Sequence, residues 1–258
     1  MCKIFAIANQ KGGVGKTTTA INLGAALASG DHSVLLVDTD AQANCSSGLG
    51  WRRQESQPTL YDLLLDGLSP DKIIVDTDLP RLKLLPADRR LAGAAVELLQ
   101  MEDREFLLSR LLETLRKDFE FILIDCPPSL NLLTINALVA ADGLLVPIQS
   151  EYMALEGVSD LMDTVERVRR RFNPKLQITG VLATMFDERT NLSNQILQEL
   201  ERYFSAKLYR TVIPRNIRLA EAPSFGKPVI LYDVRSKGAE SYISLAKEIL
   251  AHEKESIG

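Results

Sequence analysis

The sequence predicts one α/β domain built on a mainly parallel β-sheet with helices on both faces. Short apolar runs of strand length alternate with longer segments whose apolar residues recur at helical spacing, along all 258 residues. The apolar runs are nearly continuous, which is typical of parallel strands buried on both faces. No linker, repeat or low-complexity segment divides the chain, so we expect a single domain over residues 1–258.

The first forty residues predict a strand–loop–helix–strand unit. Residues 3–8 (KIFAIA) are an apolar run closed by Asn9, and a glycine-rich loop follows. Residues 17–28 have apolar residues at helical spacing, and residues 33–38 (SVLLVD) are a second apolar run. This βαβ order is the context that a phosphate-binding loop requires.

The same alternation continues along the chain and predicts the rest of the sheet. We expect further strands over residues 82–87, 119–126, 143–149, 176–186 and 208–214. We expect further helices over residues 59–65, 90–100, 106–117, 131–141, 161–172, 191–204 and 238–255. Strands that alternate with helices in this way pair in parallel, since each helix returns the chain to the same edge of the sheet.

Composition favours a cytoplasmic protein with reduced thiols. Hydrophobic residues make up 46% of the chain and charged residues 25%, the proportions of a soluble globular domain. Cys2, Cys45 and Cys126 lie far apart in the sequence, which argues against a disulfide framework or a zinc site. No apolar run reaches the ~18 residues of a membrane span, and the N-terminus lacks the cleavage pattern of a signal peptide. We expect no membrane partner.

The loop NQKGGVGKTT at residues 9–18 predicts a nucleotide site. It matches the phosphate-loop pattern of Gly, four residues and Gly-Lys-Ser/Thr, except that Gln10 replaces the first glycine. Glycines let backbone N–H groups crowd around phosphate oxygens, and the following helix adds its positive end. We expect Lys16 to neutralise the β- and γ-phosphates, Thr17 to ligate Mg²⁺ and Thr18 to bond the α-phosphate. The expected nucleotide-binding residues of the loop are Lys11, Gly12, Gly13, Val14, Gly15, Lys16, Thr17 and Thr18.

Carboxylates follow two further predicted strands. Asp38 and Asp40 come at the end of the strand over 33–38, and Asp125 comes at the end of the strand over 119–126. Ligands of open parallel sheets bind at the carboxyl ends of the strands. A strand-end aspartate is a typical partner of Mg²⁺, usually through a bound water. We therefore expect Thr17, Asp38, Asp40 and Asp125 to share the metal site, with Asp38 or Asp40 orienting the attacking water.

Lys11 is a second lysine in the phosphate loop, although Lys16 is already expected to neutralise the phosphates of the nucleotide bound there. A solvated surface lysine is one explanation. Phosphoryl transfer is, however, accelerated by a cation supplied from a second protein. We favour the hypothesis that Lys11 reaches a nucleotide held by a facing copy of the chain, which would make dimerisation depend on the γ-phosphate of ATP.

The loop KGGVGKTT resembles the deviant Walker A loop of the ParA/MinD group of ATPases. The resemblance covers nearly the whole chain and is strongest to the ParA chromosome-partitioning proteins. It extends through LLVDTDAQAN (35–44), FILIDCPPS (121–129), GVLATMFDERTNLS (180–193) and TVIPRNIRLAEAPSFGKPV (211–229).

This resemblance implies a P-loop ATPase that uses ATP and Mg²⁺ and hydrolyses slowly unless stimulated. ATP would produce a sandwich homodimer that binds double-stranded DNA without sequence preference. Hydrolysis stimulated by a ParB-type centromere-binding partner would release it, in the cytoplasm at the nucleoid, during chromosome or plasmid segregation. The family pattern assigns catalytic roles to Lys11, Lys16 and Asp40, and adenine contacts to Pro214 and Asn216.

Basic residues are concentrated in the last third of the chain. Residues 165–240 contain 14 Lys and Arg against 8 Asp and Glu, although the whole chain carries −4. Such asymmetry can mark a polyanion-binding face. The resemblance places DNA contacts at Arg189 and Arg218. The denser run Arg167, Arg169, Arg170 and Arg171 is equally well explained as a solvated helix end, and Arg215, Lys227, Arg235 and Lys237 are weaker candidates.

Two other functions fit the same scaffold. A MinD-like membrane-cycling ATPase would need a basic amphipathic C-terminal helix, whereas the tail LAKEILAHEKESIG has more glutamates than lysines. A ligase that activates a small carboxylate with ATP would need a substrate pocket beside the γ-phosphate, for which the sequence has no motif.

Overall fold

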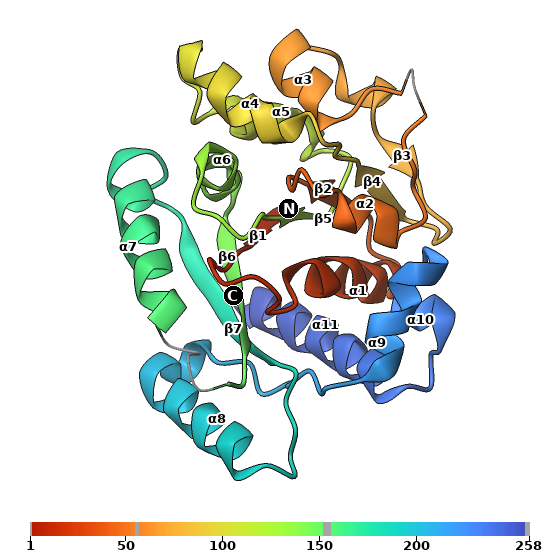
Figure 1. The fold of residues 1–258 in the computed structure, drawn as a ribbon, viewed down its shortest axis with the longest axis vertical. Coiled ribbons are helices and arrows are strands. Elements are labelled where there is room, and N and C mark those ends of the chain that lie inside the picture. Colours follow the sequence, from red (N-terminus) through yellow and green to blue (C-terminus); the bar gives the residue numbers. More distant parts are fainter. Residues whose placement is uncertain (1, 55–56, 152–155, 256–258) are drawn as a thin grey trace.

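The computed structural model describes residues 2–54, 57–151 and 156–255 (Figure 1). Its strands are β1 (Lys3–Ile7), β2 (Val34–Asp38), β3 (Val75–Asp76), β4 (Leu82–Leu85), β5 (Phe121–Asp125), β6 (Gly143–Gln149) and β7 (Gln177–Thr184). Its main helices are α1 (Lys16–Ser29), α3 (Leu60–Asp66), α4 (Leu91–Glu97), α5 (Leu107–Leu115), α6 (Leu132–Ala140), α7 (Glu156–Arg171), α8 (Asn191–Phe204) and α11 (Lys237–Glu255). Shorter helices are α2 (Asn44–Gly48), α9 (Ile217–Glu221) and α10 (Val229–Tyr232).

The strands form one sheet in the order β3-β4-β2-β5-β1-β6-β7. Every pairing is parallel except that of the two-residue edge strand β3 with β4. The predicted α/β class is therefore confirmed. β1 lies between β5 and β6, so the loop that leaves β1 opens at the centre of the sheet, where a parallel sheet offers its crevice.

Helices cover both faces of the sheet, as predicted. α1, α9, α10 and α11 pack on one face, and α3 to α8 pack on the other (Figure 1). Successive residues of β1 alternate between the two cores, with Ile4 and Ala6 in one and Phe5 and Ile7 in the other. Among the described residues, no helix is both long and apolar enough to cross a bilayer.

The prediction of a strand over residues 208–214 is wrong. This segment runs beside β7 but forms only two isolated bridges, Leu208 with Val181 of β7 and Pro214 with Phe186 just beyond it. Its amides at Tyr209 and Ile213 donate to Val181 O and Ala183 O, both at 2.9 Å. The amides of Arg210 and Thr211 are instead bonded to the Glu248 carboxylate of α11, at 2.7 and 3.0 Å. A side chain from a helix thus occupies the donors that a continuous ladder would need.

Candidate nucleotide site

The loop after β1 has the backbone that a phosphate loop needs. Gly13 has a φ of 75° and Gly15 a φ of 90°, both in the left-handed region that favours glycine. Gly15 directly precedes α1, and its carbonyl accepts from Thr19 N at 2.8 Å. The loop therefore ends at the N-terminus of a 14-residue helix, where the helix dipole favours an anion.

Two side chains that the sequence analysis did not single out hold this loop in place. Asn9 accepts from Lys11 N at 3.0 Å and donates to Pro147 O of β6 at 2.8 Å. Thr184, at the end of β7, donates its hydroxyl to Val14 O at 2.8 Å. Both lie at strand ends, which is the only feature in the sequence that could have drawn attention to them.

The two lysines of the loop have different surroundings. Lys16 is only 7% exposed, and its ammonium donates to Lys11 O at 2.9 Å. Burial lowers the pKa of Lys16, and the negative charge of Asp125 opposes this shift. Lys11 is half-buried, and its ammonium has no hydrogen bond or ion pair with any residue that the structure describes.

Two of the predicted carboxylates are paired in register at the strand ends. Asp38 of β2 lies opposite Asp125 of β5, and both are fully buried. Burial and the negative charge of Asp38 raise the pKa of Asp125 well above its usual range, while the Thr17 hydroxyl and Lys16 oppose the shift. Neither oxygen of Asp125 accepts a hydrogen bond of good geometry from the described residues. A buried carboxylate whose oxygens lack hydrogen-bond donors can be stabilised by a cation or by a cation-bound water.

Asp38 differs from Asp125 because its oxygens already have partners. One oxygen accepts from Asp40 N at 3.1 Å, and the other accepts from the amide and hydroxyl of Ser46 at 2.8 and 2.7 Å. Burial raises the pKa of Asp38 to about 6, although the bonds from Ser46 act in the opposite direction. The structure thus assigns Asp38 to the support of its own loop.

Asp40 faces the cleft that the phosphate loop forms. A cleft of about 400 Å³ is lined by Gly12, Gly13, Gly15, Lys16, Thr17, Thr18, Asp40, Asn44 and Pro128, among others. Within the described ranges, no three acidic, His or Cys side chains converge as a metal site by themselves. The donor set of Thr17 with strand-end carboxylates therefore fits Mg²⁺ only together with phosphate oxygens and water, as Mg²⁺ prefers.

A second, mainly apolar cavity of about 220 Å³ adjoins this cleft and shares Gly15, Thr18 and Met185 with it. Pro214 and Asn216 both line this cavity, with Ile213, Leu219 and Tyr242 among its other walls. The Asn216 side-chain oxygen caps α9 by accepting from Arg218 N at 2.9 Å and Leu219 N at 3.3 Å.

Comparison with known proteins decides the family. A family model described as an AAA domain matches residues 2–178. The sporulation initiation inhibitor protein Soj of Bacillus subtilis is 54% identical, covering 98% of this chain and 100% of its own. The chromosome partitioning protein ParA of Caulobacter vibrioides is 51% identical, covering 98% of this chain and 96% of its own. This chain belongs to the Soj/ParA family of chromosome-partitioning ATPases.

A solved structure shares the fold over nearly the whole length. Cobyrinic acid a,c-diamide synthase from Mycobacterium smegmatis superposes with a TM-score of 0.88 at 37% identity, covering 99% of this chain and 97% of its own. That protein has been solved with bound ADP and magnesium, and with an ATP analogue and magnesium.

The two arginines expected at a DNA interface of this Soj/ParA chain are both paired with carboxylates. Arg189 is 83% exposed and bonds Asp187 through two nitrogens, at 2.9 and 2.8 Å. Arg218 bonds Glu221 at 2.9 Å and lies 3.3 Å from Asp233. Arg189 lines a groove with Arg215 and Lys237, whereas the side chain of Arg218 turns toward α10.

The run at the end of α7 is partly structural. Arg169 donates to Leu176 O at 2.6 Å and pairs with Glu166 at 2.8 Å, so its guanidinium closes the turn after the helix. This contact favours the helix-end interpretation for Arg169.

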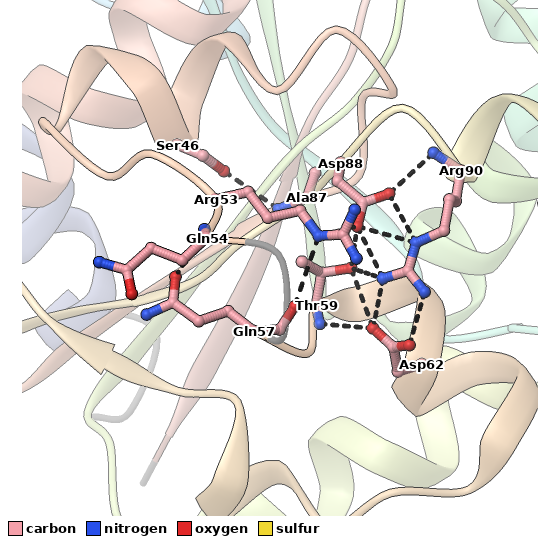
Figure 2. A network of polar contacts seen from close by, with 9 residues as sticks. All are labelled: Ser46, Arg53, Gln54, Gln57, Thr59, Asp62, Ala87, Asp88 and Arg90. Carbon is pink, nitrogen blue, oxygen red and sulfur yellow. Dashed lines mark hydrogen bonds and ion pairs between the residues drawn. The ribbon is translucent and has the colours of Figure 1, made fainter.

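A network of polar contacts that the sequence does not predict lies behind the Asp38 loop (Figure 2). Arg90 bonds both oxygens of Asp62, at 2.7 and 2.6 Å, and also bonds Asp88 at 2.8 Å. Asp88 is buried and accepts from the Thr59 hydroxyl at 2.9 Å. These residues come from two segments, 59–62 and 88–90, and no spacing in the sequence predicts that the two segments meet.

Proposed function

We propose that this Soj/ParA-family ATPase is a DNA-partitioning protein that acts as an ATP-dependent dimer. ATP and Mg²⁺ clamp two copies face to face, the dimer binds double-stranded DNA without sequence preference, and hydrolysis stimulated by a ParB-type partner releases it. The observation that carries the proposal is the loop of residues 9–18, which contains the buried Lys16 near the buried Asp125 carboxylate and a second lysine, Lys11, whose ammonium has no partner among the residues that the structure describes.

The residues around the loop divide the work on the nucleotide. The loop amides and Lys16 hold the phosphates, and the apolar cavity with Pro214 and Asn216 receives the base. Thr17 and Asp125 hold the cation, the latter through water, and Asp40 orients the attacking water. Bound Mg²⁺ supplies positive charge that neutralises the phosphoryl oxygens during transfer.

Lys11 provides the link between nucleotide and dimer. Its ammonium has no partner among the described residues, and Lys11 directly precedes Gly12, the first loop residue that lines the cleft. A γ-phosphate held by a facing copy would supply that partner, and ADP would not. Dimerisation therefore reports which nucleotide is bound.

DNA binding would follow from doubling a modest basic surface. Each copy has Arg189, Arg215 and Lys237 along one groove, and Arg218 lies nearby in sequence. Ion pairs with Asp187 and Glu221 partly neutralise Arg189 and Arg218. Phosphate contacts release counterions, so the affinity falls steeply with salt and ignores sequence. Because a dimer carries twice the contacts, ATP controls DNA binding through valency and keeps the protein at the nucleoid only in its ATP form.

A DNA-binding titration tests this function. Retention of a random-sequence duplex is measured with ATP, with ADP and without nucleotide, each at two salt concentrations. We expect tight, salt-sensitive binding with ATP alone, and release when a ParB-type partner is added. Equal binding by an ADP-loaded monomer would contradict the proposal.

The synthase named among the structural neighbours favours one second candidate, an ATP-dependent ligase on the same scaffold. Such an enzyme turns over ATP in the presence of its small acid, independently of DNA or a protein partner. Release of ADP that follows an added carboxylate and ignores DNA would support the ligase.

A MinD-like membrane cycle has less support. The apolar side chains of α11, including Tyr242, Leu245 and Ile249, are buried against the domain core rather than available to a bilayer. Sedimentation with anionic liposomes and ATP tests this alternative.

A further inference from the structure

The Asp38 carboxylate is the centre of a hydrogen-bonded clasp that closes the loop after β2. Its three donors are Asp40 N, Ser46 N and the Ser46 hydroxyl, at 3.1, 2.8 and 2.7 Å. All three belong to residues 40–46, so one carboxylate fixes both ends of the loop. Inside the loop, Ala43 has a φ of 52°, a conformation that non-glycine residues rarely adopt and that needs outside support.

The direction of both hydrogen bonds of the Ser46 hydroxyl is fixed by its partners. It is fully buried, and it accepts from Ala87 N at 3.0 Å. A backbone amide can only donate, so the single hydroxyl proton must go to Asp38. Removal of this oxygen would leave a buried amide without an acceptor and a buried carboxylate with one donor fewer.

The segment that holds Ser46 from behind is itself firmly anchored (Figure 2). Ala87 precedes Asp88, whose carboxylate bonds Thr59 and Arg90. Arg90 in turn bonds Asp62 at the start of α3. A continuous chain of buried or half-buried polar contacts therefore runs from the surface of α3 to the carboxylate beside the nucleotide cleft.

We propose that Ser46 is a positioning residue for Asp40. Its hydroxyl orients the Asp38 carboxylate, which in turn holds the Asp40 amide and so fixes where the Asp40 side chain enters the cleft. The inference rests on the proposed function for its effect on hydrolysis, because Asp40 is there the residue that orients water. Ser46 is absent from the residues that line the cleft, so the nucleotide itself does not depend on it.

Ser46→Ala tests the proposal with readouts that separate positioning from binding. We expect kcat for ATP hydrolysis to fall about tenfold, the effect of a lost hydrogen bond to a charged group. The Kd for Mg²⁺·ADP, measured by calorimetry, should stay within about twofold of the wild type. Hydrogen–deuterium exchange at the amides of Asp40 and Ala87 should quicken by about tenfold in the nucleotide-free protein.

A double-mutant cycle shows whether Ser46 acts through Asp38. In an Asp38→Asn background, Ser46→Ala should change exchange at the Asp40 amide far less than it does in the wild type. Ser193→Ala is the matched control, since it removes another buried, hydrogen-bonded serine hydroxyl on the distant helix α8. It should leave kcat and both exchange rates unchanged.

Additive effects in the cycle, wild-type kcat in Ser46→Ala, or a loss of Mg²⁺·ADP affinity equal to the loss of kcat would each overturn the proposal. If the wild-type protein does not hydrolyse ATP, the proposed function fails, and the exchange rates alone then decide whether the clasp exists.

Discussion

At the scale of single residues, the phosphate loop separates two lysines by burial. Lys16 is committed to the interior of the loop, while Lys11 contributes only its carbonyl to that contact. The sequence raises the question of the second lysine, and no residue that the structure describes pairs with the Lys11 ammonium.

Lys11→Ala should abolish ATP-dependent dimers and leave ADP binding by the monomer intact. The reason is that the lysine's proposed partner, a γ-phosphate on a facing copy, exists only with ATP. Light scattering with a non-hydrolysable ATP analogue measures the dimer, and calorimetry measures ADP. Lys72→Ala serves as a control, because it removes an exposed lysine that does not line the nucleotide cleft, and it should dimerise normally. Dimers that persist in Lys11→Ala would remove the trans role.

The buried carboxyl of Asp125 should make the nucleotide-free protein less stable as the pH rises. Its pKa is raised in the folded state, so above pH 4 the unfolded chain has lost a proton that the folded chain keeps. Stability then falls with pH by up to about 1.4 kcal/mol per pH unit until the folded group also ionises. Asp125→Asn lacks this dependence and should unfold in urea at a higher midpoint than the wild type at pH 7.

The control for this prediction is Asp118→Asn, which alters an exposed carboxyl and should follow the wild-type pH profile. An Asp125→Asn variant whose advantage is the same at pH 4 and pH 7 would contradict the assignment, because the difference would then not come from titration.

At the scale of elements, the packing of the segment 208–214 on β7 depends on one glycine. An added Cβ at Gly180 would lie 2.2 Å from a ring carbon of Tyr209, which is fully buried. The β6–β7 pairing also shifts register between Leu144 and Leu145, next to this point. Gly180 therefore allows the tyrosine ring to lie directly on the strand backbone.

Gly180→Ala should destabilise the protein by about 1–3 kcal/mol, the cost of overpacking a filled core. Gly93→Ala is the matched control at an exposed position of helix α4, where the added Cβ meets only an oxygen of the Glu97 carboxylate, at 3.2 Å. It should gain roughly 0.5–1 kcal/mol from helix propensity. Urea unfolding measures both, and equal stabilities would disprove the packing argument.

The secondary-structure elements also show which parts of the fold could be predicted from the sequence. Parallel strands and long helices follow from apolar periodicity, and the phosphate loop follows from local spacing, so both were found. The 208–214 segment was misread because its apolar pattern suits a strand while Glu248, on a helix far along the chain, takes its donors. Arg90 was missed because its partner Asp62, 28 residues away, meets it only through tertiary structure.

At the scale of the whole molecule, the proposed DNA binding rests on charge. The chain is acidic overall at −4, and the arginines proposed for DNA are already bonded to carboxylates. A phosphate must therefore replace an existing partner, which limits the gain from each contact and makes the number of contacts decisive.

Arg218→Glu should keep ATP hydrolysis and ATP-dependent dimers but lose retention of DNA, since it reverses one charge per copy beside Glu221 and Asp233. The slope of log affinity against log salt should become shallower. Arg110→Glu on α5 reverses an equally exposed charge that pairs with Asp103, and it should bind DNA as the wild type does. Unchanged retention by Arg218→Glu would exclude this residue from the interface.

The close packing of α1 against α11 sets an order of events during synthesis. The Thr19 hydroxyl of α1 lies 3.2 Å from the Tyr242 hydroxyl, and about 200 residues separate the two helices along the chain. While the ribosome is still translating, the first helix of the nascent chain has no such neighbour. The newborn protein can therefore bury this face of its first helix only near the end of translation, when α11 leaves the ribosome.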